Sequence, residues 1–412
     1  MTVRKQPNRY QNVHARILPA EILLLVFKLI RYDILDTETG WYHRKAYRDL
    51  LSCQLVCRAW RGPATEVLYC HVTLDSADSI RLFVKAWRAA KGSALRIEGL
   101  HLKTWTVQYF RSLNNRPLFR MKRPLAQLEA LLASADGPTD LSVGYDSFHR
   151  DSGATVVWED ARVPLLQACT SRLRTLHLDG DYDAEAYEFL PIRSHSCLFT
   201  SSKFCFLEDL TFSTMSIGYG EAPQFAISVL HLRKLRLHKC HFGYIWLQRF
   251  IENMPSLRHL VLRESSCFSN ASRDPSLAQI FDQHAARVTR LEYIHITGIS
   301  RAHDWHSFNT LRTLTVTSSV LYAASSWPLA LQELIVHLSL PGHRTATQGE
   351  LWHEAATLWA AACSLKASSP SLRLLELWGS FGPGGLRTWQ AIGLLFRDAL
   401  SRHGVQLVIY LK

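Results

Sequence analysis

The sequence predicts an α/β fold, in which short parallel strands form a curved sheet with helices on its outer face, preceded by a small helical module. A leucine-spaced phrase recurs along the chain, for example as MPSLRHLVL (254–262) and SPSLRLLEL (369–377). Segments with helical apolar periodicity lie between its copies, and an apolar helical run precedes them all. A unit with one apolar strand face and one apolar helix stripe cannot bury both alone, so neighbouring units must stack.

Three helices are expected before the repeats. The first starts near Pro19, because a proline in the first turn lacks only an N–H that would be unpaired anyway. Asp49 is a fair N-cap for a second helix, which runs to Trp60. Gly62-Pro63 ends the second helix, and a third helix follows.

The first helix is apolar nearly all round. Leaving a leucine or phenylalanine exposed forgoes roughly 1.5–3 kcal/mol, and a small module has little material to cover several of them. We therefore expect the rest of the chain, or another protein, to cover the spare side. One apolar stripe holds Ile22, Leu25, Val26 and Leu29, whereas Leu23, Leu24 and Phe27 lie off it.

Each copy of the phrase is expected to form a strand whose last two apolar residues face the core, because they lie two residues apart. Successive copies lie 20 to 41 residues apart, and the shorter steps match leucine-rich repeats, which run about 20–29 residues. The phrases resemble divergent leucine-rich repeats without the asparagine that often follows the third leucine. The core-facing pairs are Leu100/Leu102, Leu141/Val143, Leu176/Leu178, Leu210/Phe212, Leu235/Leu237, Leu260/Leu262, Ile294/Ile296, Leu314/Val316, Leu334/Val336 and Leu375/Leu377.

Two of the segments between strands are predicted as return helices. Residues 242–254 carry an apolar stripe that stops at Pro255. Residues 388–403 do the same and stop at Gly404, and the strand-like segment 405–411 follows. The alternative to a solenoid is an ordinary α/β protein with leucine-rich strands.

Two segments near the start match a known motif. LPAEIL (18–23) is followed by LSCQLVCRAW (51–60), in which LVCRAW is the most specific part. Together they resemble the F-box, particularly as it occurs in fungal F-box proteins. The expected layout is a disordered basic tail at 1–16, a three-helix F-box at 17–74 and a leucine-rich-repeat solenoid at 75–412. An F-box followed by such repeats is itself a family arrangement.

The resemblance implies a non-catalytic substrate receptor of a Skp–cullin–F-box ubiquitin ligase. The F-box would bind the Skp adaptor, and through it a cullin–RING ligase, while the solenoid holds the target protein; no cofactor or metal is implied. The connector at 32–47 is longer than usual and is expected to be a solvent loop. Leu18, Pro19, Ile22 and Leu23 would face the adaptor, and Leu51, Val56, Cys57 and Trp60 match positions shared between that interface and the core of the module.

The target surface is expected on the strand positions that point away from the core. Residues 231–263 contain seven lysines and arginines against one acid, so this stretch predicts a basic stripe. A stripe of one sign attracts the opposite charge, which favours an acidic or phosphorylated segment of the target. The alternative is a solvated basic strand with no partner. The expected residues are Lys234, Arg236, His238, His259, Arg263 and His295.

A second class of function stays open, a nucleic-acid-binding or scaffold repeat protein whose first helices only cap the solenoid. Residues 101–124 carry six basic and four aromatic residues without an acid, a composition that can bind single-stranded nucleic acid. Such a run is more often a loop over an apolar edge, so we expect a protein partner rather than nucleic acid.

Composition limits the remaining classes. The formal charge of +12 favours acidic partners without choosing among them. Nine scattered cysteines fit reduced thiols in the cytoplasm or nucleus. The longest apolar runs are six residues, too short for a membrane span. None of the common catalytic, phosphate-loop or zinc motifs is found, so any reaction is expected on other subunits.

Overall fold

The chain divides into two compact units in the computed structural model. The first comprises Met1–His149 with Ala168–Leu173, and the second comprises Arg150–Gln167 with Arg174–Lys412. The predicted tail at 1–16, most of the 32–47 connector, residues 103–124 and His295 lie outside the described part. The structure describes residues 18–32, 44–74, 77–89, 97–102, 126–133, 137–144, 168–169, 172–179, 190–192, 204–217, 231–268, 277–294, 305–324, 326–338, 348–379 and 383–411.

Three helices open the first unit: α1 (Ala20–Tyr32), α2 (Arg44–Val56) and α3 (Arg58–Cys70). The carbonyl of Pro19 accepts the first N–H groups of α1, from Ile22 and Leu23, both at 3.1 Å. The prediction that this helix starts at Pro19 is therefore confirmed.

The break between α2 and α3 lies elsewhere than expected. Asp49 is inside α2 rather than at its N-cap, and Trp60 belongs to α3. The two helices are separated at Cys57, whose extended backbone (φ −162°, ψ 170°) interrupts the helical run. The predicted break at Gly62–Pro63 is wrong, because α3 continues through Pro63, whose missing N–H leaves one carbonyl of the preceding turn without its helical hydrogen bond.

The three helices contact one another and share a core. The ring of Phe27 meets Trp60 edge-on, with 5.4 Å between ring centroids. Cys53 and Leu68 pack at the border of this core. The module therefore has a filled interior of its own, built from the buried residues Leu23, Phe27, Leu50, Ala64 and Val67.

The first unit continues with three parallel strands. They are β1 (His71–Leu74), β2 (Gly99–Leu102) and β3 (Asp140–Val143), and α4 (Ala77–Ala89) follows β1. The core pairs predicted for β2 and β3 are buried, as is the equivalent pair of β1. These strands thus share a compact unit with the three helices, although the sequence placed a boundary at residue 74.

The second unit is built on a parallel sheet in the order β4-β6-β8-β10-β12-β13-β14-β15-β16. A shorter parallel sheet, β5-β7-β9-β11, lies beside its first half. The predicted solenoid-like α/β architecture is confirmed at this level. The strands are β4 (Thr175–Asp179), β5 (Leu190–Ile192), β6 (Asp209–Ser213), β7 (Met215–Ile217), β8 (Lys234–His238), β9 (His241–Gly243), β10 (His259–Arg263), β11 (Ser266–Phe268), β12 (Arg290–Ile294), β13 (Thr313–Thr317), β14 (Glu333–His337), β15 (Leu374–Gly379) and β16 (Gln406–Leu411).

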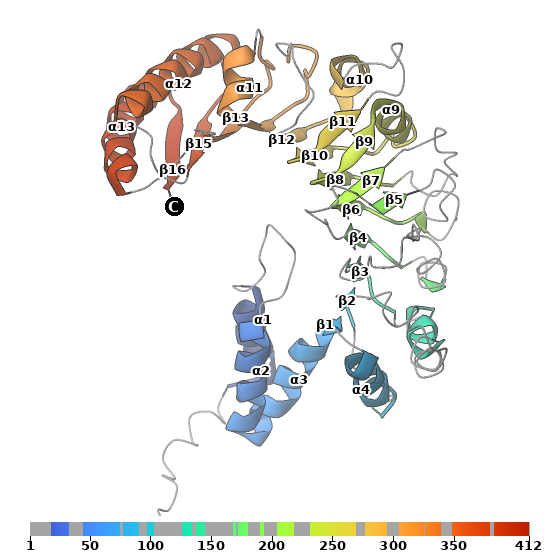
Figure 1. Cartoon of the computed structure of the whole chain (residues 1–412). Coiled ribbons are helices and arrows are strands. Elements are labelled where there is room, and N and C mark those ends of the chain that lie inside the picture. Colours follow the sequence, from blue (N-terminus) through green and yellow to red (C-terminus); the bar gives the residue numbers. More distant parts are fainter. Residues whose placement is uncertain are drawn as a thin grey trace, which may run out of the picture. The chain divides into compact units, whose positions relative to one another are not determined.

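Helices cover one face of this curved sheet (Figure 1). The predicted stripe at 242–254 becomes α9, with Trp246 and Phe250 among its buried residues. The last helix ends as predicted, with Gly404 at a positive φ of 70° that glycine adopts without strain. The helices are α9 (Tyr244–Glu252), α10 (Leu277–His284), the 3₁₀ turn η5 (Ala285–Arg287), α11 (Ser318–Ala323), α12 (Gln348–Ser368) and α13 (Pro383–Ser401).

The register of β12 differs from the prediction. Ile294 and Ile296 were expected as the core pair, whereas Leu291 and Tyr293 align with the core leucines of β10 and are buried. Ile294 is also buried but aligns with Arg263, and Ile296 lies outside the described part. The expected phrase was displaced by an odd number of residues, and such a displacement turns every side chain to the other face. The phrase in β12 is harder to recognise because Val288 and Tyr293 stand where other copies have leucine.

The turns after β6, β8 and β10 share the same backbone conformation and the same hydrogen bond. In each turn a residue at positive φ follows the strand and donates its N–H to the last carbonyl of the neighbouring strand. These hydrogen bonds join each repeat to the next one along the sheet. The bonds run from Thr214 (φ 52°) to His238 at 2.9 Å, from Lys239 (φ 52°) to Arg263 at 2.8 Å, and from Glu264 (φ 50°) to Ile294 at 2.8 Å.

One residue further on, Cys240 and Ser265 occupy the place that asparagine takes in many leucine-rich repeats. The Sγ of Cys240 lies 3.2 Å from the carbonyl of Phe212, and burial raises the pKa of its thiol to about 12. The Cys240 N–H donates to the Ser265 hydroxyl at 3.1 Å, and that hydroxyl lies 3.1 Å from the Leu237 carbonyl. A small polar side chain therefore satisfies the buried turn in place of an amide.

Replacing Ser265 by alanine is expected to destabilise the second unit by about 1–3 kcal/mol, because the buried N–H of Cys240 loses its acceptor. Ser401→Ala removes an exposed hydroxyl and should cost less than about 0.5 kcal/mol. Urea unfolding of the two variants gives the comparison. Equal stabilities would show that the hydroxyl does not hold the turn.

Candidate functional site

An apolar stripe on α1 and α2 points away from the core of the helical module. Leu25 is 58 % exposed and Leu29 is 64 % exposed, although both are large and apolar. Such a cluster is typical of a surface that another protein covers. We call it the helical apolar surface, and its members are Leu18, Pro19, Ile22, Leu25, Val26 and Leu29 of the first helical segment with Leu51, Leu55 and Val56 of α2.

The predicted adaptor residues separate into two groups. Leu18, Pro19 and Ile22 are exposed, as the resemblance implies, and Leu51 and Val56 are each 47 % exposed. Cys57 is half-buried at the break between α2 and α3, and Trp60 packs on Phe27.

Leu23 is a correction to the prediction. It was expected to face an adaptor, but it is 1 % exposed and belongs to the core beside Phe27. The regular stripe that periodicity identifies on α1 is the exposed one, and the side with Leu23 and Phe27 is the buried one. Periodicity shows that a helix has apolar sides, but it does not say which side meets the rest of the fold.

The second candidate surface is the strand face, by which we mean the side chains of the second unit's sheet that point away from its helices. Asp209 of β6 lies beside two predicted target residues of β8. Its carboxylate is 2.8 Å from the guanidinium of Arg236 and 4.0 Å from the ammonium of Lys234. Burial and the neighbouring Arg236 lower the pKa of Lys234, and Asp209 partly opposes this effect.

Glu292 of β12 is a second acidic centre on the strand face, and β8 and β10 lie between it and Asp209 of β6. Its carboxylate lies 3.2 Å from His259 Nε2 and 3.2 Å from the guanidinium of Arg290. Burial alone would raise the pKa of Glu292, but the hydrogen bond and the charge of His259, followed by the charges of Arg290 and Lys234, outweigh it and lower the pKa to about 2. Burial lowers the pKa of His259, so at neutral pH a neutral imidazole donates its Nε2–H to the carboxylate.

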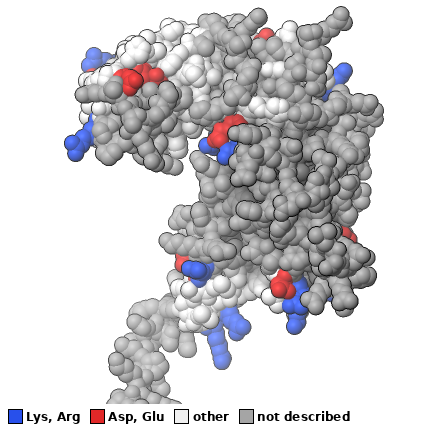
Figure 2. Space-filling view, in the orientation of Figure 1, with Lys and Arg blue, Asp and Glu red and all other residues white. Residues whose placement is uncertain are grey.

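The prediction of a uniformly basic stripe is wrong. Arg263 lies 3.8 Å from Glu264, and His238 at the end of β8 pairs in register with Arg263. Among the described residues seen in Figure 2, basic side chains are scattered and do not form one broad surface. Asp209 lies on the neighbouring β6, outside the stretch 231–263 whose charges were counted, and Glu292 was missed because the predicted register of β12 placed His295 on this face in its stead. The remaining predicted residue, His295, lies outside the described part.

A serine–histidine pair also escaped the sequence analysis. His177 Nε2 on β4 lies 2.9 Å from the Ser213 hydroxyl on β6. A nucleophile and a base within hydrogen-bond reach are the first requirement of nucleophilic catalysis. The second requirement is a third group that orients the base. Ser213 is buried, and the nearby Asp179 accepts a hydrogen bond from Thr214 at 2.7 Å. We therefore assign these side chains to a hydrogen-bond network at the strand ends.

One group in the described part has the composition of a metal site. Cys70, His71 and Glu98 place their potential ligand atoms within 4.8 Å of one another, where α3 leads into β1. The side chains of His71 and Glu98 already lie 3.6 Å apart, as an ordinary ion pair would. This contact accounts for the grouping without a metal.

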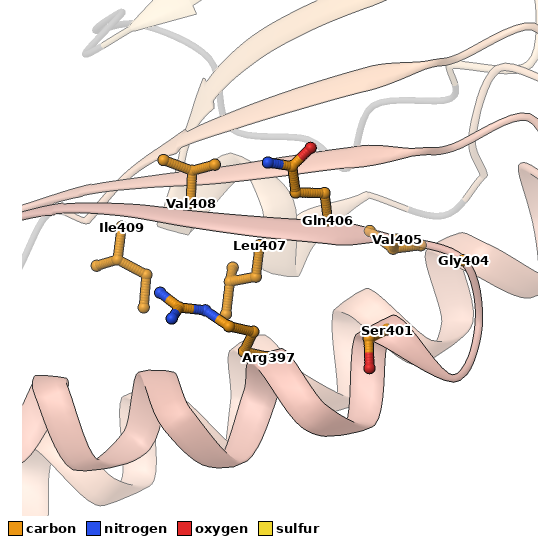
Figure 3. A pocket seen from close by; sticks show the side chains of 8 residues that line it. All are labelled: Arg397, Ser401, Gly404, Val405, Gln406, Leu407, Val408 and Ile409. Atoms are coloured by element: carbon orange, nitrogen blue, oxygen red, sulfur yellow. The ribbon is translucent and has the colours of Figure 1, made fainter.

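A cavity of about 580 Å³ lies between α13 and β16 (Figure 3). Leu407 and Ile409 point from β16 toward the helix, whereas Gln406 and Val408 point to the opposite side of the strand. Its polar lining consists of Arg397, Ser401 and Gln406, and no histidine, carboxylate or cysteine among the lining residues could act as a base for the Ser401 hydroxyl.

Comparison with known proteins adds no identity: no family model and no curated protein sequence matches this chain. Within the described residues, no helix is both long enough and apolar enough to span a membrane. The candidate sites therefore rest on geometry and on the motif resemblance.

Proposed function

We propose that the chain is a target-recognition subunit of a Skp–cullin–F-box ubiquitin ligase. In this role the helical module binds the Skp adaptor and the strand face holds the target protein, while the transfer of ubiquitin takes place on other subunits. The proposal combines the F-box resemblance of residues 17–74 with the geometry of the helices.

The observation that carries the proposal is the division of α1 into two sides. Leu23 and Phe27 fill the core of the module, and the opposite stripe stays exposed although it is equally apolar. Burying each of those exposed side chains against a partner is worth roughly 1.5–3 kcal/mol. A helix that packs only against its own bundle usually has polar residues on the side that faces away from the core.

The strand face supports the second half of the proposal. Its charged side chains form compensated pairs around Asp209 and Glu292, so the surface offers directed hydrogen bonds and ion pairs rather than a single strong field. Such surfaces give specificity by complementarity to one partner. The expected preference for an acidic or phosphorylated target is therefore not part of the proposal.

Co-purification with a Skp adaptor tests the proposal. Leu18→Ala combined with Pro19→Ala should lower adaptor capture at least tenfold, because both residues lie on the helical apolar surface and outside the core. The matched control is Leu394→Ala combined with Leu395→Ala, which removes two exposed leucines from α13 and should leave capture unaltered.

The opposite results are also informative. Equal capture by both double variants, or no capture by the unaltered chain, contradicts the proposal. Salt-sensitive binding of random RNA or DNA without adaptor capture would favour the nucleic-acid-binding alternative.

A further inference from the structure

The last three strands carry an aromatic row on the strand face. His337, Trp378 and Tyr410 occupy the same register position on β14, β15 and β16. The rings of Trp378 and Tyr410 stack with centroids 4.2 Å apart, and those of His337 and Trp378 stack at 6.1 Å. Tyr410 lies at the end of the row on the last strand and is 42 % exposed.

Two carboxylates lie on the same face as this row, Glu376 in the adjacent register position and Glu333 one position further along β14. Glu376 accepts a hydrogen bond from Trp378 Nε1 at 3.1 Å, and Glu333 accepts one from the Thr313 hydroxyl at 3.1 Å. Neither forms an ion pair with any residue that the structure describes, in contrast to Asp209 and Glu292. Each keeps acceptor capacity for a donor from outside the chain.

The surroundings are acidic and aromatic in a chain that is basic overall. The positions of β14–β16 on the strand face are all at least partly exposed, and none is a lysine or an arginine. The formal charge of the chain is +12, which disfavours a cation at long range. A local preference for a cation must therefore come from the carboxylates and aromatic rings of this area. The positions are Glu333, Ile335, His337, Leu374, Glu376, Trp378, Gln406, Val408 and Tyr410.

We propose that this end of the strand face binds an arginine of the target protein. The guanidinium would stack on the exposed side of the Tyr410 ring and pair with the carboxylate of Glu376 on the adjacent strand. Arginine is favoured over lysine because its planar group can stack on an aromatic ring and form two parallel hydrogen bonds to a carboxylate. The inference rests on the proposed function, since it names the chemistry of the target that the strand face holds.

The partly exposed apolar positions fit the same occupant. Ile335 and Val408 flank Glu376 on the two neighbouring strands, and Leu374 lies beside Glu333, so these side chains can contact the aliphatic stem of an arginine and its neighbours. Aromatic side chains grouped with a few polar ones are typical of the residues that dominate binding energy at protein interfaces.

Fluorescence anisotropy with labelled peptides tests the inference on the full chain. The probe is a fluorescein-labelled glycine–serine peptide that carries two arginines, and matched peptides carry lysine, glutamine or glutamate instead. We expect the arginine peptide to bind at least tenfold more tightly than the glutamine peptide, with the lysine peptide between them and the glutamate peptide weakest.

Substitutions at two positions of the chain complete the experiment. Glu376→Gln keeps the shape of the side chain and should weaken binding of the arginine peptide at least fivefold, and Tyr410→Ala should do the same while Tyr410→Phe retains binding. The matched control is Glu66→Gln, which removes one exposed carboxylate from α3 and should leave binding unaltered. A thermal melt identifies a variant that fails to fold, and the near-isosteric Glu376→Gln then decides the question.

Equal binding of the arginine and glutamine peptides overturns the inference, and so does a Glu376→Gln variant that binds as tightly as the unaltered chain. Preferential binding of the glutamate peptide also overturns it and would revive the expectation of an acidic target. Adaptor capture by the Glu376→Gln variant is measured in parallel and should be unaltered. Loss of peptide preference with normal adaptor capture removes only this inference, whereas absent adaptor capture removes the proposed function.

Discussion

Replacing Phe27 by alanine is expected to destabilise the helical module by about 3–5 kcal/mol, the usual cost of removing a buried phenylalanine side chain. Phe27 is fully buried and meets Trp60 edge-on in the core, so the substitution leaves a cavity that the three short helices cannot close. The amides of α1 and α3 should lose most of their protection from hydrogen exchange, which reports on this module separately from the solenoid.

The control lies two residues away on the same helix. Leu25→Ala removes a leucine that is 58 % exposed, so it should change stability by less than about 0.5 kcal/mol while weakening adaptor capture. The pair of variants therefore separates folding from binding on one helix. If Leu25→Ala proved the more destabilising change, the buried and exposed sides of α1 would be exchanged, and the basis of the proposed function would be lost.

Acidification is expected to destabilise the second unit in two steps that belong to one ion-pair group. Glu292 has a pKa of about 2 in the folded chain against an ordinary value of 4.5. A carboxyl with a lowered pKa stabilises the fold above its ordinary value, and this contribution disappears as the pH falls from about 4.5 toward 2. At roughly 1.4 kcal/mol per pKa unit, this difference corresponds to about 3–3.5 kcal/mol.

His259 should produce the earlier step. Burial lowers its pKa from the ordinary 6.5, so the folded state favours the neutral ring. Its contribution is fully present above pH 6.5 and is lost as the pH falls through the lowered value, because the unfolded chain then takes up the proton more readily. The two groups thus change stability in the same direction.

Urea unfolding between pH 8 and pH 2.5 measures both steps. Glu292→Gln should lose the step below pH 4.5, and His259→Gln should lose the earlier step and reduce the later one, because His259 contributes most to the lowered pKa of Glu292. Glu66→Gln should leave the pH dependence unaltered. A stability that is independent of pH in the unaltered chain would show that the charges around Glu292 do not contribute to folding.

The periodicity of the sequence is sufficient to predict which strand residues are buried, because successive side chains on a strand point alternately to the two faces of the sheet. Leu176 and Leu178 face the core, as does every other predicted pair in the described strands except the one in β12. There the phrase has Tyr293 in place of a leucine, and the displaced alignment reversed the two faces. The prediction of α9 was correct because its buried residues follow the helical spacing and Pro255 comes shortly after its end.

The candidate sites were less predictable because they depend on pairs of residues far apart in the chain. Counting charges along one stretch gave a basic stripe, but Asp209 and Glu292 reach Arg236 and His259 through strand pairing, which the sequence does not display. The aromatic row was overlooked for the same reason, because Trp378 and Tyr410 become neighbours only when β16 is aligned on β15. The side of α1 that meets the bundle depends on α3, so helix periodicity could not assign it.

The two sides of α1 also differ in how freely they can change over evolutionary time. A substitution at Phe27 alters the solubility and abundance of the whole chain, whatever its partner. Under the proposed function, a substitution at Leu25 alters only the fit to the adaptor, so that position can follow the adaptor's own mutations. Descendants of this chain could therefore exchange one docking subunit for another by varying a few exposed leucines, with no change to the interior that keeps the helix in place.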